Sequence, residues 1–154
     1  MNRYKAEDFT SGEHGIVNGY FSTFDHDHGD SQGQVIKKGA FSESIDRRKA
    51  TGRPFPLLLN HDWNIIIGMV TDIGEDEKGA YFSAALFPTE QAQEIRHIIH
   101  TGILWQASFE YRVIDCGRIR AKDGNKVTEL RKLELYEISI VLYPANDHTA
   151  ITCT

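Results

Sequence analysis

Hydrophobic residues along the chain mostly fall into short runs of strand-like composition, separated by residues that favour turns. The predicted strands cover residues 15–24, 55–60, 65–73, 80–86, 104–116 and 127–143. Predicted turns lie at 52–56, 74–79 and 123–125, and a polar loop covers 25–33. This pattern predicts a mainly β protein.

Two segments depart from the strand pattern. Residues 39–45 predict a short helix, with Ser42 as its candidate N-terminal cap. A longer helix is predicted after Thr89, another good cap, and Gly102 is a typical helix stop. Its apolar residues recur at three- and four-residue spacing and are Ala92, Ile95, Ile98 and Ile99. Many strands with few helices predict an α+β fold, a closed or nearly closed β-barrel surrounded by a few helices.

Length and composition narrow the class of protein. A chain of 154 residues has the usual size of one domain, so we predict a single domain over residues 1–154. A net charge of −5 argues against a nucleic-acid partner. The apolar runs are too short to cross a membrane, and no signal peptide is expected at the first residues.

The two cysteines, Cys116 and Cys153, lie far apart and fit no metal-binding spacing. We interpret them as free thiols in a reducing cytoplasm, with a disulfide as the alternative.

Three polar, reactive side chains lie in or directly after apolar, strand-like runs. Ser108 lies within residues 105–111, His61 follows the strand at 55–60, and Glu137 lies within 134–141. A hydroxyl, an imidazole and a carboxylate held on strands are the components of an acyl-transfer site. In such a site Ser108 is the nucleophile, His61 is its base, and the carboxylate orients the imidazole.

The third member of this set has alternatives. Glu137 shares a strand face with Ser139, whereas Glu134 has the opposite parity. Asp147 and His148 follow the strand in a loop that also reaches its end. Asp62 is adjacent to His61 but points to the other face of an extended segment, so it is a poor partner for the imidazole.

The loop at 25–30 suggests a different chemistry. Its alternating aspartate and histidine residues place His26, His28 and Asp30 on one face of an extended segment, where they offer donors for a divalent ion. The same residues beside a glycine are common turn formers. We therefore expect no metal and no cofactor, and retain a metal-dependent hydrolase or metal-stabilised module as a lesser hypothesis.

Taken together, several segments resemble the prohead, or capsid maturation, proteases of tailed bacteriophages. The matching stretches are GYFS at 19–22 with Asp25 and Asp30 after it, KGAF at 38–41, PLLLNHD at 56–62, IG at 67–68, GAYF at 79–82, AQEI at 92–95, ASFEY at 107–111 and LYEISIVLYPAN at 135–146. The last block is the most specific. The resemblance covers roughly residues 15–151, which is nearly the whole chain.

The resemblance implies a serine endopeptidase with the fold of the herpesvirus assembly proteases, a β-barrel surrounded by helices with a His-Ser-His triad. The family's histidine falls on His61 and its serine on Ser108. No histidine is present on the matching third strand, where Glu137 implies a Ser-His-Glu triad. The herpesvirus enzymes also use an arginine beyond that strand, but this chain has no arginine after Arg131.

The resemblance also implies a setting. The expected substrates are a scaffold protein or the N-terminal segment of the major capsid protein, together with the protease itself, in the immature capsid inside the host cytoplasm. The gene is expected in a phage or prophage, and the protein in a homo-oligomer such as a dimer. The alternative is a catalytically silent assembly module of the same fold that binds capsid or scaffold proteins.

Overall fold

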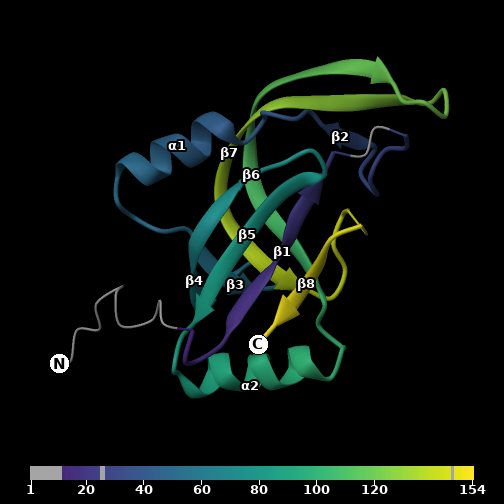
Figure 1. The fold of residues 1–154 in the computed structure, drawn as a ribbon. Coiled ribbons are helices and arrows are strands. Elements are labelled where there is room, and N and C mark those ends of the chain that lie inside the picture. Colours follow the sequence, from purple (N-terminus) through teal and green to yellow (C-terminus); the bar gives the residue numbers. More distant parts are fainter. Residues whose placement is uncertain (1–11, 25–26, 147) are drawn as a thin grey trace.

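The computed structural model describes residues 12–24, 27–146 and 148–154 (Figure 1). Its elements are β1 (Ile16–Thr23), β2 (Gln34–Ile36), α1 (Ser42–Ala50), β3 (Pro56–Leu59), β4 (Asp62–Glu75), β5 (Gly79–Leu86), α2 (Glu90–His100), β6 (Gln106–Arg120), β7 (Lys126–Val141) and β8 (Ala150–Cys153). The prediction of a mainly β protein with two helices is confirmed. The short strands β2 and β8 were not predicted.

The strands form one eight-stranded sheet in the order β2-β7-β3-β4-β5-β1-β8, with β6 also pairing with β7. The expected closure into a barrel is not confirmed, because within the described residues β6 forms no ladder with β1 or β8. Contacts across this gap come instead from Phe21 against Phe109, whose ring centroids are 5.6 Å apart, and from a backbone hydrogen bond. In that bond the Ile151 N–H donates to the Trp105 carbonyl at 2.9 Å.

Strand β7 is the centre of the arrangement that positions the site. It pairs in parallel with β2 through residues 128–130 and with β3 through residues 138–140, and antiparallel with β6 along most of its length. The far halves of β6 and β7 extend beyond the rest of the sheet as a long hairpin (Figure 1).

A bulge in β7 changes which residues face the core. Leu135 pairs with Tyr111 and Glu137 pairs with Glu110, so Tyr136 has no partner in the β6 ladder. The nearest β7 residues in the main hydrophobic core are Leu133 and Leu135 before this point and Ile138 and Ile140 after it. Because one extra residue reverses the alternation of a strand, Glu137 lies on the sheet face opposite the core.

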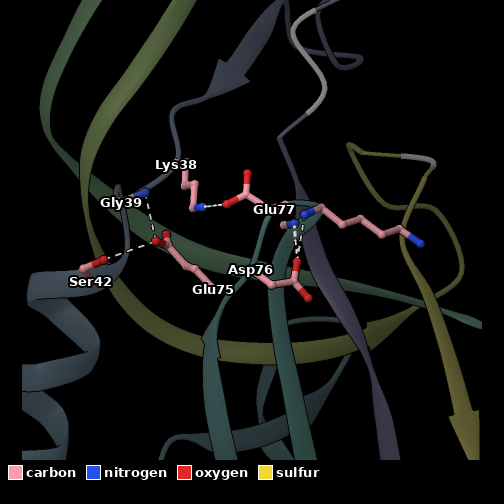
Figure 2. A network of polar contacts seen from close by, with 8 residues as sticks. Lys38, Gly39, Ser42, Glu75, Asp76 and Glu77 are labelled. Carbon is pink, nitrogen blue, oxygen red and sulfur yellow. Dashed lines mark hydrogen bonds and ion pairs between the residues drawn. The ribbon is translucent and has the colours of Figure 1, made fainter.

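Helix α1 is longer than predicted, and Ser42 is not its N-terminal cap. Phe41 occupies the cap position and makes no side-chain cap bond. The carboxylate of Glu75, at the end of β4, accepts instead from the Gly39 N–H at 2.8 Å, the Phe41 N–H at 3.1 Å and the Ser42 hydroxyl at 3.1 Å (Figure 2). A carboxylate from another element thus satisfies the free N–H groups before the helix.

Helix α2 agrees with the sequence prediction. The Thr89 side chain accepts from the Ala92 N–H at 3.3 Å, and the helix ends at His100 just before Gly102, whose φ is +83°. The face that was predicted to be apolar packs against β4, β5 and β8.

Two further expectations concern the thiols and the membrane. Cys116 and Cys153 are free thiols. In the described parts of the chain, no helix is both long enough and apolar enough to cross a membrane.

We expect Glu75→Ala to destabilise the protein by about 1–2 kcal/mol, because three donors before and at the start of α1 lose their acceptor. Urea denaturation measures the change. Glu77→Ala is the matched control, since Glu77 is almost fully exposed and its ion pair with Lys38 adds little stability (Figure 2). Equal losses in the two variants would show that Glu75 does not anchor α1.

Candidate active site

His61 lies in a tight turn between β3 and β4 with an unusual backbone. Both Asn60 and His61 adopt the left-handed conformation, with φ of +49° and +59°. This conformation is unfavourable for residues other than glycine and persists only where surrounding contacts impose it. Here the Asn60 N–H donates to the Ile140 carbonyl at 2.9 Å, and the His61 N–H donates to Ser139 Oγ at 3.0 Å. The end of β7 therefore holds the turn.

Glu137 lies directly beneath this turn. One carboxylate oxygen, Oε1, is hydrogen-bonded to His61 Nδ1, and Oε2 accepts from the Ser139 hydroxyl at 2.6 Å. Glu137 and Ser139 have no solvent exposure, whereas the His61 side chain is 36% exposed. A buried carboxylate is costly unless its oxygens are bonded, and here both oxygens have partners.

Ser108 lies on the neighbouring strand. It is directly opposite Ser139 in the antiparallel β6–β7 ladder, so the two side chains share a face with Cβ atoms about 4.5–5.5 Å apart. Ser108 is half-buried and lines a cavity of about 480 Å³ together with His61. This cavity lies where β6 and β1 fail to pair, and its walls include Phe21 and Phe109.

The three residues singled out from the sequence thus converge on one place. Glu137 contacts the Nδ1 side of the imidazole, which leaves Nε2 for a reacting group. Within the described residues, no hydrogen bond joins His61 Nε2 to Ser108 Oγ. Contacts of this kind are often long before substrate binds and shorten in the complex.

Neighbouring carboxylates raise the pKa of His61 above its ordinary value. The hydrogen bond that His61 donates to Glu137 is the largest cause, and the negative charges of Glu137 and Glu110 add to it, whereas partial burial acts in the opposite direction. Glu110 lies opposite Glu137 in the ladder and accepts from the Trp63 indole N–H at 2.8 Å. The neutral, proton-accepting form of His61 therefore becomes dominant at a higher pH than in an ordinary imidazole.

Most of the alternatives for the third residue lie elsewhere. Glu134 forms an ion pair with Arg47. Asp62 accepts from the Asn64 backbone N–H at 2.9 Å, as expected for a side chain directed away from His61. His148 lines the cavity, and Asp147 lies outside the described residues.

In the loop considered for metal binding, the side chains of His28 and Asp30 contact other groups of the protein. His28 Nδ1 lies 3.3 Å from Asp123 Oδ2, and Asp30 Oδ1 accepts from the backbone N–H groups of Gln32 and Gln34 at 2.9 Å each. Asp25 and His26 lie outside the described residues. Among those described, no group of three or more histidine, cysteine, aspartate or glutamate side chains is placed to hold a metal ion.

Comparison with known proteins shows the family to which the chain belongs. The family model described as caudovirus prohead serine protease matches residues 2–154. The chain belongs to this family. A relative in the family, the prohead protease of Enterobacteria phage HK97, is 30% identical over 149 residues, which cover 91% of this chain and 60% of that protein. The chain thus spans less than two thirds of the length of this relative.

Solved structures show the fold that this family member shares. The varicella-zoster virus protease is 13% identical, with a TM-score of 0.54 over 90% of this chain and 63% of that one. The bacteriophage T4 capsid assembly protease is 10% identical, with a TM-score of 0.59 over 82% and 80% of the two chains. The fold is therefore α+β and similar to that of the herpesvirus proteases, with an open sheet in this family member.

Ser139, which is hydrogen-bonded to both Glu137 and the His61 N–H, was not among the residues predicted for this site. From the sequence, Ser139 only marked the strand face of Glu137. The available signal was the two-residue spacing of the two side chains, which places both on one face of a strand.

We expect Glu137→Gln, made in a Ser108→Ala background, to lower the pKa of His61 towards the ordinary imidazole value, because the strongest cause of its upward shift is removed. NMR titration of the His61 ring measures the midpoint. Glu134→Gln is the matched control and leaves that midpoint in place, since its carboxylate pairs with Arg47. An unchanged midpoint in Glu137→Gln would contradict the assigned cause.

Proposed function

We propose that this protein is a serine endopeptidase that acts during maturation of a phage prohead. The observation that carries the proposal is the buried Glu137 carboxylate bonded to His61 Nδ1, beside Ser108 on the wall of the same cavity. Membership of the prohead serine protease family supports the reaction class.

The proposed reaction follows from the three side chains. Ser108 Oγ attacks the scissile carbonyl while His61 Nε2 accepts its proton, and the imidazolium then donates that proton to the departing amine. A water molecule, activated by the same imidazole, hydrolyses the acyl-enzyme ester and regenerates Ser108. Glu137 remains ionised throughout, fixes the tautomer with Nδ1 protonated, and stabilises the imidazolium.

The developing oxyanion needs donors of its own. As these donors we propose backbone N–H groups of the chain.

The proposed substrates are segments of scaffold protein or of the major capsid protein, and the protease itself. Two relatives support this setting: the HK97 protein is named a prohead protease and the T4 protein a capsid assembly protease. The proposed location is the interior of the immature capsid in the host, and the proposed assembly is a homo-oligomer. A cavity of about 480 Å³ beside Ser108 has room for side chains of an extended peptide.

We expect a fluorophosphonate to label Ser108 and this labelling to fall about 10³-fold or more in Ser108→Ala and His61→Ala, because the reagent reports an activated serine hydroxyl. Intact-protein mass spectrometry measures the adduct and, in the same samples, self-cleavage. Ser31→Ala is the control, since this exposed serine lies outside the proposed triad. A folded protein that takes no label on Ser108 would favour the silent assembly module.

We also expect labelling of Ser108 to be unchanged by excess EDTA, because the proposed reaction uses only side chains of the protein. The labelling rate with and without chelator is the measurement, and thermal melting under both conditions reports any loss of folding. A rate that falls with EDTA and returns with an added divalent ion would favour the metal-dependent hypothesis instead.

A further inference from the structure

The hydroxyl group of Ser139 connects the two halves of the His61–Glu137 pair. It donates to Glu137 Oε2 at 2.6 Å and accepts from the backbone N–H of His61 at 3.0 Å. Ser139 has no solvent exposure, so water does not compete for either bond. Since a serine hydroxyl has a single proton to donate, both partners fix its orientation.

Each bond restrains something that is otherwise free to move. His61 has a left-handed backbone, with φ of +59°, and this conformation is sterically unfavourable for a residue with a side chain. The hydrogen bond from the His61 N–H to Ser139 Oγ lies next to the Cα of His61. It therefore restrains the position from which the imidazole side chain extends. The bond to Oε2 stops rotation of the Glu137 carboxylate, which keeps Oε1 against Nδ1.

We propose that Ser139 is a positioning residue that aligns the Glu137 carboxylate with the His61 imidazole. The inference rests on the proposed function and adds a fourth side chain that touches neither the substrate nor Ser108. Without the Ser139 hydroxyl, the Glu137 carboxylate has an unbonded oxygen next to an unbonded N–H of His61. Rotation of the carboxylate towards that N–H satisfies both groups but moves Oε1 away from Nδ1.

This rearrangement predicts a specific change in the titration of His61. The carboxylates near the ring are Glu137 from β7 and Glu110 from β6, and Asp62, next in sequence, is bonded to Asn64. If Ser139 holds Glu137 in place, the loss of Ser139 weakens the largest of the effects that raise the pKa of His61, its hydrogen bond with Glu137. The midpoint then falls although no charged group has been removed.

The test compares Ser139→Ala with Ser139→Thr, which keeps the hydroxyl, and with Ser44→Ala. Ser44 is the matched control because it is also a buried serine, its Oγ accepts from the Leu135 N–H of β7 at 2.9 Å, and it lies away from the cavity. Urea denaturation establishes that each variant folds and how much stability it loses.

Two readouts separate positioning from a merely structural role. In Ser139→Ala we expect the fluorophosphonate labelling rate of Ser108 to fall about tenfold or more. A loss of this size is typical when a hydrogen-bonding group that orients an active-site side chain is removed. In the Ser108→Ala background we expect the NMR midpoint of His61 to fall as well. Ser139→Thr retains most of the rate, and Ser44→Ala loses stability with rate and midpoint unchanged.

The proposal is overturned if Ser139→Ala behaves like Ser44→Ala, with lower stability but an unchanged His61 midpoint. Because the NMR titration needs no activity, it also separates this inference from the proposed function. A parent protein that takes no label refutes the proposed function alone, whereas the His61 midpoint in Ser139→Ala still decides the role of Ser139. If Ser139→Thr does not fold, Ser139→Ala and Ser44→Ala are sufficient for this decision.

Discussion

The structure of the site depends on one buried carboxylate. Glu137 has no exposure to solvent, and a carboxylate in that position must have partners for its charge. Its partners are the imidazole of His61 and the hydroxyl of Ser139. The contact with His61, together with the bond from the His61 N–H to Ser139 Oγ, holds the β3–β4 turn on β7, where β3 and β7 are already paired in parallel. The requirement to satisfy one charge thus joins segments that are far apart in the sequence.

The hydrophobic core on the other face of the sheet fixes the position of Ser108. Phe109 follows Ser108 directly and packs edge-to-face against Phe21 and Phe41, with ring centroids 5.6 Å and 5.1 Å apart. These rings anchor β6 from its inner side. Ser108 therefore projects from a strand whose position is set by the core, as pre-organised chemistry requires.

The sequence predicted those features that depend on local pattern. The strand segments and α2 follow from alternation, helical spacing and the Thr89 cap, and all of these act over a few residues. The left-handed turn at Asn60 and His61, the bulge at Tyr136 and the cap from Glu75 depend on contacts between distant strands and were not predicted. The convergence of His61, Ser108 and Glu137 was expected from a family resemblance rather than from their spacing. Closure into a barrel is not confirmed, and strand number alone could not decide it because it does not determine which edges pair.

The parallel pairing of β3 with β7 has a consequence for when the site first exists. Leu58 pairs with Ser139, so the turn that bears His61 acquires its restraints only after residues 137–140 have been made. Contacts between residues so far apart in sequence form late in folding, because closing the intervening loop is entropically costly. A nascent chain on the ribosome exposes His61 and then Ser108 well before Glu137 emerges. By this reasoning, translation itself delays assembly of the proposed triad.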